Sequence, residues 1–149
     1  MEDQLETIYK RDYLSDKWPN IKLYLSVHSY LDAIYVPPGI LAKQPSNAED
    51  LMIMAKRMAR AIGRSRVLEG PYKGFEVRPK VVTASDLGQT SGTADDWALK
   101  MGAEFAFTIE LPPKEKMPTE STPFSLPRFL ILPVCAKYIK VSLYSNYLN

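Results

Sequence analysis

Two stretches of this sequence alternate between apolar and polar residues, and helix-like spacing surrounds them. Residues 21–27 form one predicted strand, which delivers His28 at its end, and residues 105–111 form another, which carries Glu110 near its end. The stretches with helical spacing are residues 3–17, 46–63 and 93–102. Strands that alternate with helices at these intervals predict a layered α/β domain with a mixed or largely parallel sheet.

The helix predicted over residues 46–63 has the clearest signals. Ser46, with Glu49 three residues later, fits a capping box, and Gly63 stands where a C-cap glycine is expected. Its predicted buried stripe consists of Leu51, Ala55, Met58 and Ile62. Cations on the opposite face are compatible with an anion- or RNA-binding surface or with an ordinary solvated helix face.

The remaining segments give weaker signals. Residues 33–36 predict a short strand that stops at residues 37–39, Pro-Pro-Gly. Residues 70–88 are ambiguous, because a proline interrupts an otherwise strand-like run. Residues 112–133 contain six prolines and are expected to be mostly loop, and residues 134–148 predict a short final helix.

The composition excludes several classes of protein. A chain of 149 residues is long enough for one domain with its own core. Its net charge of +2 does not indicate a nucleic-acid partner, and no apolar run approaches the roughly 20 residues that cross a bilayer, so no membrane partner is expected. The first residues lack the layout of a secretion signal, and the single Cys135 cannot form an internal disulfide.

His28 and Glu110 are the two residues best placed for chemistry. Both stand at predicted strand ends, and ligand crevices of α/β folds lie beyond the carboxyl ends of strands. Glu110 is either a general base with a raised pKa or a solvated rim carboxylate, and His28 is either functional or a satisfied structural imidazole. With one histidine in the chain, no His-rich zinc site can form from these residues alone, and no Gly-x-Ser-x-Gly or phosphate-binding glycine loop is present.

Several blocks together resemble a known family. "KLYLSVHSY", a short strand ending in "PPG", "SGTADDWALKMGAEFAFTIEL" and "FLILP" occur in the order and at the intervals typical of zinc metallocarboxypeptidases of the pancreatic carboxypeptidase A/B type. The matching blocks cover about residues 15–133 and resemble the C-terminal half of that catalytic domain. It implies a three-layer α/β/α fold with helices on both faces of a mixed, largely parallel sheet, and residues 1–149 are then a single partial peptidase domain.

The resemblance also implies a role for particular residues. His28 matches the third zinc ligand, Glu110 the catalytic glutamate, and Ser29 and Tyr30 a pair that contacts substrate. Asp95 falls at the floor of the specificity pocket, where an acidic side chain implies preference for C-terminal Lys or Arg. Cis peptide bonds are expected at Ser29-Tyr30 and Pro37-Pro38.

The chain departs from the family pattern in several places. The His-x-x-Glu motif that supplies the other two zinc ligands is missing, as are the arginines that hold the substrate carboxylate. Leu87 or Gly88 stands where the family has a tyrosine that covers the substrate, and Leu31 replaces a glycine. The expectation is therefore a secreted zinc carboxypeptidase-like protein that acts on peptide or protein C-termini, with activity that needs an upstream half. The alternative is an inactive homologue or fragment that binds basic C-termini or has only a structural role.

Overall fold

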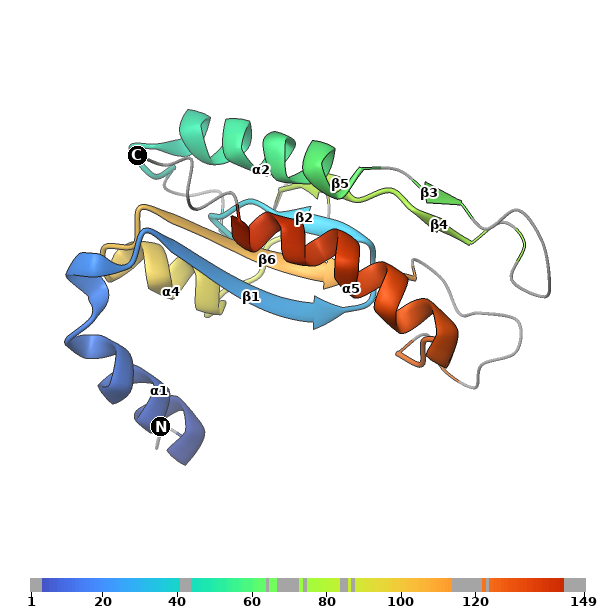
Figure 1. The fold of residues 1–149 in the computed structure, drawn as a ribbon. Helices are drawn as coiled ribbons and strands as arrows, with labels where there is room; N and C mark the ends of the chain where they lie inside the picture. Colours follow the sequence, from blue (N-terminus) through green and yellow to red (C-terminus); the bar gives the residue numbers. More distant parts are fainter. Residues whose placement is uncertain are drawn as a thin grey trace.

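The computed structural model describes residues 4–40, 44–63, 65–66, 73, 75–83, 86, 88–113, 122 and 124–143 (Figure 1). Its elements, in chain order, are α1 (Leu5–Ser15), the 3-10 turn η1 (Trp18–Asn20), β1 (Leu23–Ser29), β2 (Ala33–Tyr35), α2 (Ala48–Ile62), β3 (Ser65–Arg66), β4 (Glu76–Val77), β5 (Lys80–Val82), α4 (Ala94–Lys100), β6 (Phe105–Leu111) and α5 (Arg128–Leu143). None of the helices in these ranges is long and apolar enough to cross a membrane.

The main sheet has four strands in the order β1-β6-β2-β5. The β1-β6 and β2-β5 pairs are parallel, and the central β6-β2 pair is antiparallel. Strands β3 and β4 form a separate antiparallel pair. This arrangement confirms the predicted mixed, largely parallel sheet, and it places β1 at one edge and β6 beside it.

Helices cover both faces of the sheet, as the sequence predicts (Figure 1). Helices α2 and α5 lie on one face and contact each other, and α4 lies on the other face. The larger core fills the space between the sheet and the α2-α5 layer, with Ile34, Leu51, Met58, Phe107 and Val141 among its fully buried side chains. A smaller cluster around Trp18 and Ala106 fills the α4 side. The spaces between the sheet and its helices are therefore mainly apolar.

Helix α2 follows the predicted pattern except at its start. The predicted stripe is buried, and Gly63 caps the C-terminus with a φ of +69°. The predicted capping box at Ser46 is wrong: Asn47 is the N-cap residue and makes no side-chain capping hydrogen bond. Its side-chain Nδ2 donates to the carbonyl oxygen of Glu104, at 2.8 Å, so a tertiary contact holds this side chain.

Helix α5 corrects the prediction that the chain is loop up to Pro133. The helix begins at Arg128 and contains Pro133 in its interior. Leu130, Val134, Tyr138 and Val141 form one buried stripe along it. Proline inside a helix costs about 3 kcal/mol, and the packing of this stripe against α2 and the sheet offsets that cost. The predicted extension over residues 144–148 lies outside the described residues.

The predicted helix at the N-terminus is present, but its apolar stripe is not covered. None of the residues of α1 is buried, and Leu5, Tyr9 and Tyr13 are each about two-thirds exposed. The segment that follows is anchored by Trp18, whose ring packs edge-on against Trp97 of α4 with 4.9 Å between the ring centroids. Helix α1 is therefore attached to the domain through its C-terminal end.

A buried carboxylate ties the turn after β1 to α5. Asp32 is fully buried and adopts a positive φ of +52°. The Tyr138 hydroxyl donates to Oδ1 at 2.5 Å, and the backbone N–H of Arg78 donates to Oδ2 at 2.6 Å. Burial, and then the hydrogen bond and charge of Asp32, raise the pKa of Tyr138 far above its usual range. One side chain thus links three parts of the chain that are distant in sequence.

Candidate functional site

Strand register gathers polar side chains on the face of the sheet that α4 covers. Residues paired across neighbouring strands point to the same face. The first row is Ser26 on β1, Thr108 on β6 and Tyr35 on β2, and the second is His28, Glu110 and Ala33 in the same order. The residues between them, such as Ile34, Phe107 and Ile109, point to the opposite face and are buried in the larger core. Alternation along the strands therefore separates a site face from a core face.

His28 and Glu110 lie directly opposite each other on adjacent strands. His28 is exposed because β1 is an edge strand, and its Nε2 lies 2.9 Å from the Ser26 hydroxyl oxygen. Glu110 is half-buried, and its Oε2 is buried without a hydrogen-bond partner among the described residues. Burial raises the pKa of the Glu110 carboxyl, and the nearby His28 offsets part of that rise. The Glu110 carboxyl therefore faces the cavity side of the sheet next to the His28 imidazole, with one oxygen that makes no hydrogen bond to the described residues.

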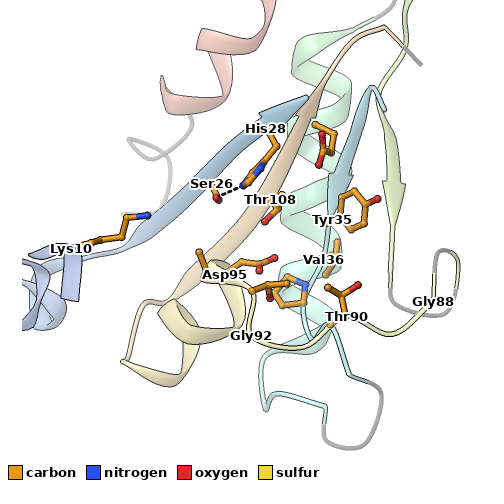
Figure 2. A pocket seen from close by; sticks show the side chains of 15 residues that line it. Lys10, Ser26, His28, Tyr35, Val36, Gly88, Thr90, Gly92, Asp95 and Thr108 are labelled. Atoms are coloured by element: carbon orange, nitrogen blue, oxygen red, sulfur yellow. Dashed lines mark hydrogen bonds between the residues drawn. The ribbon is translucent and has the colours of Figure 1, made fainter. Parts of the chain in front are cut away.

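A cavity of about 490 Å³ lies over these two rows (Figure 2). Its lining includes Ser26, His28, Tyr35, Thr108 and Glu110 from the strands. The segment before α4 and the first turn of α4 contribute the opposite side, including Thr93 and the nearly fully buried Asp95. The structure thus brings three of the predicted site residues, His28, Glu110 and Asp95, into one cavity.

Two adjacent carboxylates at the start of α4 have different environments. Both oxygens of Asp96 accept a hydrogen bond from the backbone N–H of Gly39, at 3.0 and 3.1 Å. Asp95 accepts one from the N–H of Asp96, at 3.1 Å, and lines the cavity. The Thr93 hydroxyl also lines the cavity and is buried without a partner among the described residues. Asp96 thus stabilises the fold through its bonds to Gly39, whereas Asp95 and Thr93 line the cavity and have polar atoms that could bind a ligand.

Gly39 allows the cavity wall to close. The N–H of Thr90 donates to the carbonyl oxygen of Gly39 at 2.8 Å, which joins the turn after β2 to the segment before α4. A Cβ atom at Gly39 would lie 2.1 Å from the Thr90 carbonyl oxygen, well inside van der Waals contact. Only glycine permits this approach, and the approach sets the position of Asp96 and its neighbour Asp95.

Ser29 and Tyr30 lie outside the cavity lining. Ser29 pairs with Leu111 at the end of β1, and strand alternation places its side chain on the face opposite His28. The Tyr30 ring packs edge-on against Phe124, with 5.0 Å between ring centroids. The peptide bond between Ser29 and Tyr30 is cis, as is Pro37-Pro38, and both were expected; Pro112-Pro113 is also cis.

Sequence reasoning missed Tyr35, Thr108 and Thr93 as cavity residues. Thr108 shares the polar side of its predicted strand with Glu110, and that parity could have identified it. Tyr35 lies in a strand of three residues, too short to show a period. Thr93 is the N-cap residue of α4 and makes no capping hydrogen bond with its side chain.

The described residues do not make up a complete zinc site. Protein zinc sites usually have three or four protein ligands, and the described part of the chain contains no group of three or more His, Cys, Asp or Glu side chains that could hold a metal. The His28 imidazole and the unpartnered Glu110 oxygen are suitable groups for contact with a cation, but together they fall short of a coordination shell.

Comparison with known proteins gives a consistent result. A family model described as zinc carboxypeptidase matches residues 2–140. Mast cell carboxypeptidase A of Mus musculus is 29% identical over 137 residues, which are 90% of this chain and 29% of that protein. Carboxypeptidase B of Bos taurus is 31% identical over 134 residues, again 90% of this chain and 29% of that protein. This chain therefore spans less than a third of the length of these relatives.

Comparison with solved structures shows the same fold in other carboxypeptidase-related proteins. Bovine thrombin-activatable fibrinolysis inhibitor, solved in complex with tick carboxypeptidase inhibitor, is similar with a TM-score of 0.75 and 26% identity, over 95% of this chain and 44% of that chain. The carboxypeptidase A of Helicoverpa armigera is similar with a TM-score of 0.74 over 93% of this chain and 32% of that chain, and at 22% identity it supports the fold alone.

Proposed function

Because this chain belongs to the zinc carboxypeptidase family, we propose that it is part of a catalytic domain that removes the C-terminal residue of peptides, with preference for Lys or Arg. Residues 1–149 form the C-terminal half of that domain. His28 supplies one zinc ligand, and the activity needs further ligands that these 149 residues, with their single histidine, do not supply. The family resemblance also makes a secreted, extracellular protein part of the proposal.

The observation that carries this proposal is the placement of His28 and Glu110. They come from strands distant in sequence, lie opposite each other in register, and line one cavity with Asp95. The raised pKa of Glu110 suits a general base that accepts a proton from the attacking water and passes it to the leaving amine. In a domain that completes the zinc site, the metal would be held in part by His28 and would supply polarisation of the scissile carbonyl and of the attacking water.

Asp95 supports the proposed preference for basic residues. It is 4% exposed and lines the cavity, so a cationic side chain that enters there meets a carboxylate with little competing water. Thr93 adds a hydroxyl without a partner in the described structure. Ser29 and Tyr30 lie outside the cavity and, by the family resemblance, are proposed to contact parts of the peptide that do not enter it.

The alternative function is that of an inactive homologue that binds basic C-termini or acts structurally. The same cavity supports it, since binding a basic side chain needs Asp95 but no metal.

Two titrations of the 149-residue chain test the proposal. The first adds acetyl-Gly-Gly-Arg, acetyl-Gly-Gly-Lys or acetyl-Gly-Gly-Leu while the imidazole NMR signal of His28, the sole histidine, is recorded. We expect the two basic peptides to bind and Asp95→Asn to weaken both, whereas Asp12→Asn on the exposed side of α1 has no effect. Equal binding of the peptide that ends in Leu would show that the cavity does not select a cation.

The second titration adds zinc. We expect weak, non-stoichiometric binding and no release of arginine above background from the basic peptide, because one histidine and one carboxylate do not complete a zinc shell. One tightly held zinc per chain would show that residues 1–149 complete the metal site. Arginine release that depends on Glu110 would show that they also suffice for activity.

A further inference from the structure

The cavity holds one aromatic side chain whose position no catalytic role explains. Of the described residues that line it, Tyr35 is the only tyrosine, phenylalanine or tryptophan. Tyr35 is opposite Thr108 in register, so it lies on the site face of the sheet, one row from Glu110. Figure 2 shows Tyr35 reaching the cavity from β2 and Asp95 reaching it from the first turn of α4. An aromatic ring and a buried carboxylate therefore border the same space from different elements.

The carboxylates that border this space are more buried than its positively charged groups, since Asp95 is buried and Glu110 half-buried while Lys10 and His28 are exposed, and this difference favours a cation in the cavity. Asp95 and Glu110 are the carboxylates that line it, and the titratable groups of opposite charge are His28 on β1 and Lys10 at the edge from α1. Burial raises the pKa of Tyr35, and the charge of Glu110 raises it further, so the phenol stays neutral and its ring feels a negative neighbour. A neutral ring attracts a cation to its face.

We propose that Tyr35 is a specificity-determining residue that makes this cavity favour a guanidinium group over an ammonium group, and so C-terminal Arg over Lys. This inference rests on the proposed function, because it assumes that a basic side chain enters the cavity beside Asp95. A guanidinium group is planar and weakly hydrated, so it can stack on an aromatic ring while it donates two hydrogen bonds to a carboxylate. An ammonium group is compact and strongly hydrated and gains less from the ring.

Tyr35 also has a simpler possible role, as a side chain that fills space beside Thr108. That role predicts that Tyr35 substitutions change stability and shift the affinity for both cations together. A stacking role predicts instead a change in the ratio of the two affinities. The ratio is therefore the quantity to measure.

The experiment uses n-propylguanidinium and n-butylammonium, which correspond to the side chains of Arg and Lys from Cβ outward. Each is titrated into the full 149-residue chain while the His28 imidazole signal is recorded by NMR, since this residue lines the same cavity. We expect the guanidinium to bind about fivefold more tightly, the ratio expected for one partly desolvated cation–aromatic contact. Tyr35→Leu should bring the ratio close to one, and Tyr35→Phe should preserve it because the ring remains.

Two further variants complete the design. Tyr9→Leu, on the exposed face of α1, removes an aromatic residue outside the cavity and should leave the ratio unchanged. Asp95→Asn should weaken both probes. If neither probe binds the wild type, or if Asp95→Asn has no effect, the basic pocket of the proposed function is wrong and this inference falls with it.

If both probes bind with equal affinity, the Tyr35 inference is overturned while the basic pocket stands. The same conclusion follows if Tyr35→Phe loses the preference. The wild-type ratio and the Tyr35→Phe variant decide the matter even where Tyr35→Leu fails to fold.

Discussion

Removing the Tyr138 hydroxyl tests whether the buried link between α5 and the turn after β1 stabilises the domain. Tyr138→Phe keeps the ring, which is only 7% exposed, and deletes the donor to Asp32 Oδ1. The Asp32 carboxylate is fully buried and retains the hydrogen bond from the Arg78 N–H. It loses one donor that water cannot readily replace, because the site is closed to solvent.

The expected loss of stability is about 2 kcal/mol, the middle of the range for buried hydrogen bonds to charged groups. With a urea m-value of about 2 kcal/mol/M, the unfolding midpoint should fall by about 1 M. Urea unfolding followed by tryptophan fluorescence measures this shift, since Trp18 and Trp97 pack against each other in the folded domain. Tyr9→Phe is the matched control, because Tyr9 is 69% exposed and its change should stay within about 0.5 kcal/mol.

A double-mutant cycle with Asp32→Asn assigns the effect to this pair. If Tyr138 acts through Asp32, the double variant should be more stable than the sum of the single effects predicts, by about 1 kcal/mol or more. A Tyr138→Phe midpoint equal to that of the control, or strictly additive losses in the cycle, would refute the link as a source of stability.

Three other changes have expected outcomes. Gly39→Ala should destabilise the chain by about 1–3 kcal/mol in urea unfolding, because its Cβ would lie 2.1 Å from the Thr90 carbonyl oxygen; unchanged stability would mean that the wall moves freely. Glu110→Gln should be more stable than the wild type near pH 7, because burial raises the folded-state pKa of Glu110 and its charged form therefore destabilises the folded chain. The difference should vanish as the pH falls to near 4, where the carboxyl is protonated in the folded chain and the charge is lost. A difference independent of pH would contradict this. Leu132 on α5 is 79% exposed, so Leu132→Lys should raise the ammonium sulfate concentration needed for precipitation while stability stays within about 0.5 kcal/mol. A precipitation point equal to that of the wild type would show that another surface, such as the edge strand β1, limits solubility.

Strand periodicity predicted the two strands that carry the site, and with them the side of each strand on which the functional residue lies. β6 has the predicted bounds, and β1 begins and ends two residues later than predicted. Alternation placed His28 with the polar residues of β1 and Glu110 with those of β6, and the structure confirms both. Periodicity could not show that β1 and β6 are neighbours, because the 75 or so residues between them carry no signal of pairing order. The expectation that both residues lie at one crevice came from the general position of ligand sites in α/β folds.

The failures of the sequence analysis share a physical cause. Pro133 stands inside α5, and Asn47, at the start of α2, uses its side-chain Nδ2 in a hydrogen bond to the Glu104 carbonyl oxygen. In both cases a tertiary contact outweighs a local preference, and no window of sequence contains that contact. For α1 the helix itself is predicted correctly, but none of its residues is buried in the described structure, although its helical spacing is typical of a packed helix.

Asp95 and His28 reach the same cavity by different means, and this difference decides how predictable each is. His28 is placed by strand register, so a shift of one residue would turn its ring to the opposite face of the sheet, away from the cavity. Asp95 is placed by the contacts of its neighbours: Asp96 holds Gly39, and Gly39 holds Thr90. Each of these contacts joins segments about 50 residues or more apart. A strand pattern can therefore indicate His28, whereas the position of Asp95 follows only once the turn after β2 has closed on the segment before α4.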